Sequence, residues 1–534
     1  MMTGMTIDTH ANSINGRTQI EDTDYLYNLG TGSYEIGDYP NAVDYLQRAA
    51  AQGHAAAQNK LAMCYANGYG VQEDQTKAAE WYQKAAEQGY AQAQCYLGTL
   101  YYTGDGMSQD FSKAAEWFQK AADQNYTEAQ FCLAVCYEKG RGVSQDYGKA
   151  AEWYQKAAEQ GDAMSQYNLG LLYEDGLGVA QDYEKAAEWY RKAAEQGDGE
   201  AQLNLGFCYY DGQGVPQDYA KAVEWYQKAA EQGEIVAKFN LGVCYENGLG
   251  VSQSYTNAAE WYLKAAEQDY AIAQYNLGNL YYNGLGVAQS YSKAVAWYQK
   301  AAEQGDGEAQ FNLGICFENG QGVPQDYAKA VEWYQKSAEQ GNADAQYNLG
   351  MCLENGQGVP QDYEKAAEWY RKAAEQGDAQ AQTMLGYCHK FGQGVAQDYS
   401  KAIEWYKKAA AQGHVPALFN LGYSYECGHG VPQSNSKAAE LYQQTAEQGF
   451  ARAQFNLGGF YYKGQGVEKD RAKAVEWWLK AADQEMEIAQ YWLGHCYENG
   501  QGVEKDRAKA VEWYRKAAEN DSDMAKEALK KMGK

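Results

Sequence analysis

The sequence predicts an all-α solenoid, a stack of helix–turn–helix repeats, from two observations. One leucine recurs every 36 residues from Leu61 to Leu493, in thirteen copies without insertion or deletion, and Leu529 keeps the register. A fixed period of this length indicates units that stack on their neighbours instead of separate globular domains. The second observation is composition, because 534 residues with only 6 prolines and 45% hydrophobic residues favour helices with a packed core.

The period divides the chain into four parts. Residues 1–22 are polar and are predicted to form a disordered N-terminal tail. Residues 23–56 form a shorter first unit around Leu29, which lacks about four residues of the loop found in later repeats. Residues 57–520 hold the thirteen full repeats, and residues 521–534 are predicted to form a capping helix.

Each full repeat is predicted to contain two helices, helix A and helix B. In the repeat around Leu349, helix A covers about residues 344–355, and helix B begins after Asp362 and ends near Gln376. The motif G-x-G separates them in all thirteen repeats, and an Asp or Ser follows at the N-cap of helix B. Most B helices are followed by Gly, which tolerates left-handed backbone, but Glu485 breaks this pattern.

Apolar and small residues indicate how the two helices pack. Helix B carries Trp at one position in twelve of the thirteen repeats, and an aromatic residue follows in every one. Flanking alanines predict that both aromatics are core residues. Helix A has Gly after its leucine in eleven repeats and Ala in two. Since Gly inside a helix costs about 1 kcal/mol, the small residue predicts a close approach of helix B.

The unit Ala345–Gln380 reads AQYNLGMCLENGQGVPQDYEKAAEWYRKAAEQGDAQ and resembles the Sel-1-like repeat, a branch of the tetratricopeptide-repeat superfamily. The resemblance covers about residues 24–531, and the unit around Leu29 is closer to a plain tetratricopeptide repeat. It implies a right-handed superhelix with helix A on the concave face and helix B on the convex face. It also implies a non-catalytic scaffold or adaptor that binds proteins or peptides, although some cysteine-rich bacterial members are linked to cell-wall chemistry.

Charge and hydropathy bound the partners and the location. The chain has 45 Lys+Arg against 71 Asp+Glu, a net charge of −26, which argues against nucleic acid as a partner. No apolar run approaches the roughly 20 residues of a membrane span, so membrane insertion is not expected. The first 22 residues show no signal peptide, so a cytoplasmic location is expected, with export by a signal-less route left open.

Motifs for catalysis and metal binding are incomplete, so no catalytic residue, metal or cofactor is predicted. G-x-G-V lacks the preceding strand and the G-K-[ST] of a phosphate loop. The S-x-x-K motifs at Ser290 and Ser434 coincide with helix B starts. Cys132 and Cys136 have no histidine nearby. Eight cysteines stand three residues after the leucine, where Leu and Phe also occur, and are predicted to be buried and reduced: Cys64, Cys136, Cys208, Cys244, Cys316, Cys352, Cys388 and Cys496.

The residue before the leucine is Asn in six consecutive repeats: Asn168, Asn204, Asn240, Asn276, Asn312 and Asn348. In tetratricopeptide superhelices the matching position faces the groove, and this run is similar to an asparagine ladder that grips the backbone of an extended peptide. Asn suits that role because its amide both donates and accepts. The alternative is that these asparagines bond to adjacent repeats and support the stack.

Two residues after the leucine, a variable and mostly apolar line shares the face of the asparagines: Leu171, Phe207, Val243, Ile315, Met351 and Tyr387. Variation among near-identical repeats indicates exposure, and exposed apolar residues mark interaction surfaces, with drift of a partly buried position as the alternative. Five residues after the leucine, Glu alternates with Tyr102, Tyr210, Tyr282 and Tyr462, and the glutamates favour a ligand with basic residues.

The leading hypothesis is therefore a non-catalytic scaffold that binds a protein or an extended peptide on helix A. An enzyme of the cell-wall-linked secreted branch and a purely structural spacer are the alternatives, and the sequence leaves the oligomeric state open.

Overall fold

The computed structural model describes residues 22–534, which contain 29 α-helices and no strand. The odd-numbered helices are the A helices: α1 (Thr23–Glu35), α3 (Ala55–Asn67), α5 (Ala91–Thr103), α7 (Thr127–Lys139), α9 (Ala163–Asp175), α11 (Gly199–Asp211), α13 (Ile235–Asn247), α15 (Ala271–Asn283), α17 (Gly307–Asn319), α19 (Ala343–Asn355), α21 (Ala379–Phe391), α23 (Val415–Cys427), α25 (Ala451–Lys463), α27 (Glu487–Asn499) and the terminal α29 (Asp523–Lys531). The even-numbered helices are the B helices: α2 (Tyr39–Ala51), α4 (Gln75–Glu87), α6 (Phe111–Ala122), α8 (Tyr147–Glu159), α10 (Tyr183–Glu195), α12 (Tyr219–Glu231), α14 (Tyr255–Ala266), α16 (Tyr291–Glu303), α18 (Tyr327–Glu339), α20 (Tyr363–Glu375), α22 (Tyr399–Ala411), α24 (Asn435–Glu447), α26 (Arg471–Ala482) and α28 (Arg507–Glu519).

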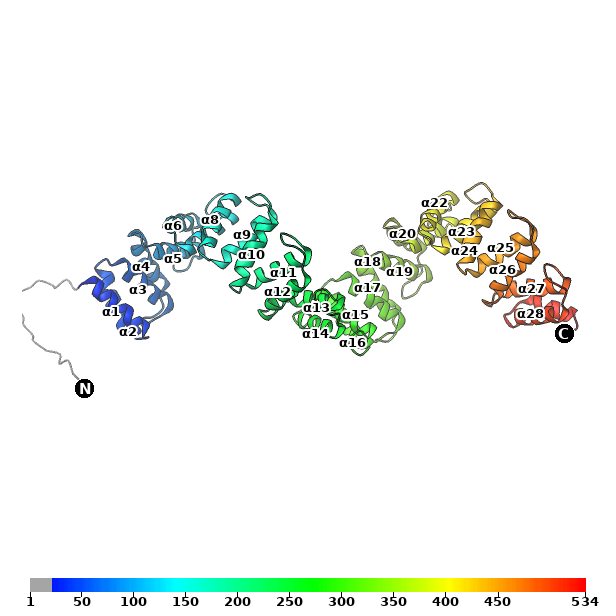
Figure 1. Ribbon diagram of the computed structural model, residues 1–534, viewed down its shortest axis with the longest axis horizontal. Coiled ribbons are helices and arrows are strands. Elements are labelled where there is room, and N and C mark those ends of the chain that lie inside the picture. Colours follow the sequence, from blue (N-terminus) through cyan, green and yellow to red (C-terminus); the bar gives the residue numbers. More distant parts are fainter. Residues whose placement is uncertain (1–21) are drawn as a thin grey trace, which may run out of the picture. The chain divides into compact units, whose positions relative to one another are not determined.

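The helices form two compact units, one ending at Trp261 and the other beginning at Tyr262. Within each unit a helix A packs against its own helix B, and that helix B packs against the next helix A (Figure 1). The prediction of an all-α stack of helix–turn–helix repeats is confirmed. The predicted disordered tail lies outside the described residues except for Asp22, whose side chain caps α1.

The two glycines of the G-x-G loop have different tasks. Gly356 takes left-handed backbone at φ 69° and ends α19. Gly358, at φ 72°, lies against the first turn of α18 in the preceding repeat, where an added Cβ would stand 2.3 Å from the Tyr327 carbonyl. Comparable close approaches recur at the second glycine of other loops, such as Gly214 against Tyr183 and Gly466 against Asn435. The loop therefore joins each repeat to the one before it, backbone to backbone.

A second close approach joins helix A to helix B within a repeat. A Cβ added to Gly350 would lie 2.6 Å from Cε1 of Tyr370, which confirms the predicted need for a small residue. Asp362 begins the same helix B, because its Oδ1 accepts from the backbone N–H of Lys365 at 3.0 Å. The predicted N-cap thus fixes where the helix starts and so where Tyr370 meets helix A.

The ends of the B helices are tied together by glutamines that sequence reasoning did not single out. Nε2 of Gln346 in α19 donates to the carbonyl of Ala338 near the end of α18, at 3.0 Å. Its Oε1 accepts from Nε2 of Gln376 at the end of α20, at 2.8 Å. Helix C-terminal carbonyls lack partners inside their own helix, so one amide satisfies α18 and links it to α20. The pattern is absent where Lys238 and Leu418 replace the glutamine.

The two aromatics of helix B are not equivalent. Tyr370 is fully buried, as predicted, but Trp369 is only half-buried, so the prediction that both are core is wrong for the tryptophan. Trp369 packs at the edge of the core that contains Tyr334 of the preceding repeat. Nζ of Lys372 lies over its ring, 3.6 Å from the centroid. The tryptophan is therefore an inter-repeat contact that a lysine covers from outside.

The residue after helix B has left-handed backbone even where it is not glycine. Glu485 takes left-handed backbone at φ 61°, as Asn125 and Asp269 do, so the fold imposes this geometry even on a residue that disfavours it.

Of the eight cysteines after the leucine, seven are buried and Cys208 is half-buried. No described cysteine forms a disulfide. Burial raises the pKa of Cys316 to about 12, which keeps this thiol protonated and unreactive.

Replacement of Gly358 by Ala should weaken the stack much more than replacement of Gly377. Both glycines have left-handed backbone, but a Cβ on Gly377 meets nothing within 4 Å, whereas one on Gly358 meets the Tyr327 backbone. We expect a loss of about 2–4 kcal/mol for Gly358→Ala and about 1 kcal/mol for Gly377→Ala. Urea unfolding followed by circular dichroism measures both, and equal shifts of the first transition would show that the loop contact contributes little.

Candidate partner-binding surface on helix A

The helix A face comprises the residues one before, two after, five after and six after each repeat leucine. All six predicted asparagines are half-buried. The apolar line is also half-buried at Leu171, Phe207, Val243, Ile315 and Met351, whereas Tyr387 is 37% exposed. Several of these side chains contact the core, as Phe207 does with Tyr226 at a ring separation of 5.7 Å. The variable line is thus the rim of the core, with its outer atoms open to solvent.

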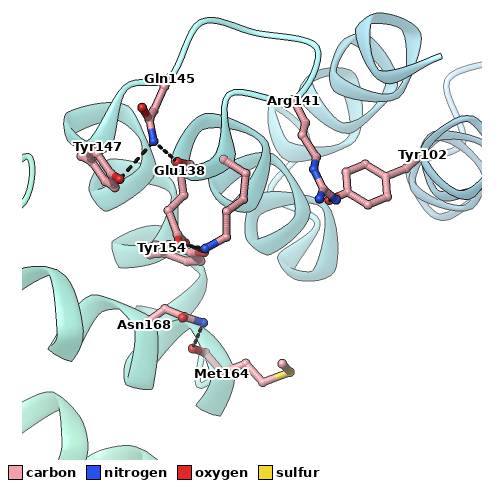
Figure 2. Close-up of polar contacts among 9 residues, drawn as sticks. Tyr102, Glu138, Arg141, Gln145, Tyr147, Tyr154, Met164 and Asn168 are labelled. Atoms are coloured by element: carbon pink, nitrogen blue, oxygen red, sulfur yellow. Dashed lines mark hydrogen bonds and ion pairs between the residues drawn. The ribbon is translucent and has the colours of Figure 1, made fainter. Parts of the chain in front are cut away.

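The asparagines use part of their hydrogen-bonding capacity inside the protein. Nδ2 of Asn168 donates to the Met164 carbonyl of its own helix at 2.8 Å (Figure 2). Nδ2 of Asn312 reaches Oδ1 of Asn279 in the preceding repeat at 3.3 Å. Nδ2 of Asn240 is buried and has no partner among the described residues. These contacts differ from repeat to repeat, so the asparagines do not form one uniform internal network.

Buried tyrosines from helix B reach the helix A face and donate to its glutamates. The hydroxyl of Tyr370 donates to Oε2 of Glu354 at 2.6 Å. Figure 2 shows the same pair at Tyr154 and Glu138, where Lys139 also reaches the carboxylate at 2.5 Å. The pairs are Tyr154–Glu138, Tyr190–Glu174, Tyr334–Glu318, Tyr370–Glu354, Tyr442–Glu426 and Tyr514–Glu498. The glutamates therefore join helix A to helix B and are not free rim charges.

The tyrosine hydroxyl in this pair stays protonated, so it is the hydrogen-bond donor and the glutamate carboxylate is the acceptor. Burial, and then the Glu354 carboxylate, raise the pKa of Tyr370 well above its usual range. In earlier repeats, the Asn204 side chain beside Tyr190 and the Asn348 side chain beside Tyr334 lower the pKa of these tyrosines. The asparagine of one repeat thus lies beside the tyrosine–glutamate pair of the repeat before it.

Where Tyr replaces Glu on helix A, a different contact replaces the pair. Nη1 of Arg141 donates to the hydroxyl of Tyr102 at 2.6 Å, and its guanidinium lies over that ring (Figure 2). The hydroxyl of Tyr282 donates to Oε1 of Gln321 at 2.7 Å. Both partners stand in the loop of the next repeat. Glu and Tyr at this position are therefore alternative ways to join elements of the stack.

An exposed aromatic cluster lies on α21 and α23. It consists of Tyr387, 37% exposed, Phe391, 50% exposed, and Tyr423, 36% exposed. Nζ of Lys390 lies 4.4 Å from the Tyr423 centroid and 5.1 Å from that of Phe391. Sequence reasoning found only Tyr387 as a site residue. The missed signal is that Phe391 stands six residues after the leucine, where other repeats have mainly Asn, Asp or Lys.

Tyr370→Phe should destabilise the protein, whereas Tyr406→Phe should not. The Tyr370 hydroxyl donates to a carboxylate, but the Tyr406 hydroxyl is buried without a partner, since Lys390 stands where its glutamate would be. We expect a loss of about 1–3 kcal/mol for Tyr370→Phe and little change or a slight gain for Tyr406→Phe. Thermal unfolding of both variants measures this, and equal effects would contradict the role assigned to the pair.

The residues that the structure describes were compared with the requirements of a metal site and of a membrane-spanning helix. Within residues 22–534, no group of three His, Cys, Asp or Glu side chains is placed to hold a metal ion. Cys132 instead packs against the core cluster that contains Cys95 of the preceding repeat. None of the helices in this part of the chain combines the length and apolarity required to cross a bilayer.

Comparisons with known proteins agree with this architecture. The Sel1 repeat profile matches fourteen consecutive segments, from residues 25–54 and 55–90 through to 488–522. The crystal structure of c5321, a protective antigen of uropathogenic Escherichia coli with an SLR fold, is 40% identical, covers 85% of this chain and 97% of its own, and has a TM-score of 0.73. A Sel1 repeat protein from Oxalobacter formigenes is 36% identical, with 58% and 89% covered and a TM-score of 0.49. No curated protein matches the chain closely enough to serve as a relative. The chain belongs to the Sel1 repeat family.

Proposed function

We propose that the protein is a non-catalytic scaffold that binds a partner protein, as an extended segment, along the helix A face. Sel1 repeat proteins are generally scaffolds for protein interactions, and this general role is the starting point. Placement of the partner on helix A is the specific part of the proposal. It concerns Asn168, Asn204 and Asn240 in the compact unit that ends at Trp261, and Asn276, Asn312 and Asn348 in the compact unit that begins at Tyr262.

The observation that carries the proposal is the exposed cluster of Tyr387, Phe391 and Tyr423. Three aromatic side chains with exposed fractions of 36–50% lie on two neighbouring A helices. Exposed aromatic area of this kind costs solubility and marks interaction surfaces, where tyrosine is among the residues that contribute most to binding. The tryptophans of the described B helices, by contrast, are half-buried or buried. Helix A therefore offers the more accessible aromatic surface.

The charge of the protein favours a partner with basic residues. The net charge is −26, and the glutamates of the helix A face are half-buried. In the Tyr370–Glu354 pair the hydroxyl occupies Oε2, so the second oxygen remains for a donor from a partner. Such charges affect mainly the association rate and its salt dependence. The enzyme and spacer hypotheses have no comparable observation in their favour.

Tyr387→Ala combined with Tyr423→Ala should weaken partner binding roughly tenfold or more. The matched control is Tyr363→Ala, because Tyr363 is 38% exposed but begins a B helix. A partner captured from native lysate is identified and then titrated against the purified variants by calorimetry. The control should bind like the unmodified protein. Equal binding by both variants would place the partner elsewhere, and no partner for either would favour a spacer.

The same titration separates the two roles of the asparagines. Asn240, Asn276 and Asn312 are replaced together by Ala. If they hold the partner, binding weakens while the melting temperature stays within a few degrees, because each loses at most local contacts. If the variant unfolds, the asparagines support the stack. Normal binding with normal stability would remove them from the proposed site and leave the aromatic cluster as its centre.

A further inference from the structure

The repeat around Leu457 and the one that follows it depart from the repeat pattern at four positions that meet in space. Gly459 stands two residues after Leu457, where most repeats carry a larger side chain. Trp478 replaces the buried tyrosine of helix B, and Trp492 replaces the asparagine of the next helix A. Tyr462 replaces the glutamate five residues after the leucine. The other repeats serve as internal references, because the same backbone there carries the usual residues.

These departures form an aromatic hollow of about 130 Å³ on the helix A face. Trp478 is its floor, since it is only 2% exposed and its Nε1 donates to the Phe455 carbonyl at 3.0 Å. Trp492 stacks on Trp478 with a centroid separation of 5.5 Å, and Tyr462 lies 5.4 Å from Trp478 and 5.8 Å from Trp492. A Cβ on Gly459 would meet nothing within 4 Å, so the missing side chain leaves the hollow open.

The polar groups at the rim favour a cation. Glu426 lines the hollow, and the Tyr442 hydroxyl donates to its Oε2 at 2.6 Å, which leaves Oε1 for another donor. Asn456 lines it as well and adds an amide oxygen. Aromatic faces attract cations, most strongly those of tryptophan. Two cations of the chain stand at the edge of the hollow. The Lys463 side chain is exposed and can turn toward solvent, and the Arg471 guanidinium lies over the Tyr462 ring.

The chain itself shows which cation suits tyrosine at this position. In the equivalent place on α5, the guanidinium of Arg141 lies over the Tyr102 ring at 5.4 Å. In α26 the guanidinium of Arg471 lies over Tyr462 at 5.2 Å. A guanidinium is planar and can stack on an indole while it donates to a carboxylate, which a lysine ammonium cannot do. A single arginine side chain therefore matches the hollow in shape and charge.

We propose that the hollow bounded by Trp478, Trp492, Tyr462 and Glu426 binds an arginine side chain presented by the partner protein. The arginine stacks on the Trp492 indole, above the buried Trp478, and donates to Oε1 of Glu426. The inference deepens the proposed scaffold function and rests on it for the source of the arginine. Binding in the hollow can be measured without any partner protein. The arginine proposal and the scaffold proposal can therefore fail independently of each other.

The probe is acetyl-arginine-amide, compared with acetyl-lysine-amide and acetyl-leucine-amide. Indole N–H signals of the ¹⁵N-labelled protein report binding, and Trp492→Phe identifies the signal of that residue. We expect a saturable shift of the Trp492 and Trp478 signals with the arginine probe, and affinity weaker by roughly fivefold or more for the other two. No shift with the arginine probe, or equal affinity for the leucine probe, would overturn the proposal.

Two variants locate the binding. Gly459→Leu fills the hollow with the side chain that the same position carries at Leu171, and it should abolish the shift. Glu426→Gln keeps an acceptor for Tyr442 but removes the charge, and it should weaken binding roughly fivefold. Ile315→Leu, at the equivalent position in the repeat around Leu313, is the control and should change nothing. If both test variants bind the arginine probe normally, it binds elsewhere and the proposal fails. Failure here leaves the partner titration of the Tyr387 and Tyr423 variant untouched.

Discussion

The contact between the second loop glycine and the preceding helix B is the constraint on which the rest of the fold depends. At Gly358 the backbone of one repeat lies so close to the Tyr327 carbonyl that no side chain fits between them. This contact fixes the spacing of adjacent repeats, and a repeat of constant spacing needs a constant length. We attribute the 36-residue period without insertion to this backbone contact. The close packing of Gly350 against Tyr370 fixes how helix A and helix B lie within the repeat.

The same stack determines which positions of helix A are available to a partner. Tyrosines from helix B pass through the core and hold the glutamates of helix A, as in the Tyr154–Glu138 pair. Glutamines hold the B-helix ends in the same way. These polar residues cannot vary freely, because each leaves a buried group unsatisfied when it is lost. Variation is therefore greatest two residues after the leucine, where the exposed Tyr387 stands. The exposed Phe391 departs from the Asn, Asp or Lys that most repeats carry six residues after the leucine.

Much of the fold could be predicted because it is local and repeated thirteen times. The caps at Asp362 and Gly356 and the small residue at Gly350 follow from the sequence pattern. Contacts between elements could not be predicted in the same way. The burial of Trp369 depends on the neighbouring repeat and on Lys372, and the engagement of Glu354 depends on a tyrosine sixteen residues away. The hollow at Gly459 arises only when departures on α25, α26 and α27 are placed together.

Hydrogen exchange along the whole chain in mild denaturant tests the central claim most directly, namely that each repeat is stabilised by its nearest neighbours. Mass spectrometry of peptides from each helix gives the denaturant concentration at which protection is lost. The nearest-neighbour account predicts loss in blocks of adjacent repeats, beginning near the ends or where the glutamine pattern is broken at Lys238 and Leu418. Simultaneous loss of protection in every helix from α1 to α29 would contradict it, because it would require a single cooperative unit.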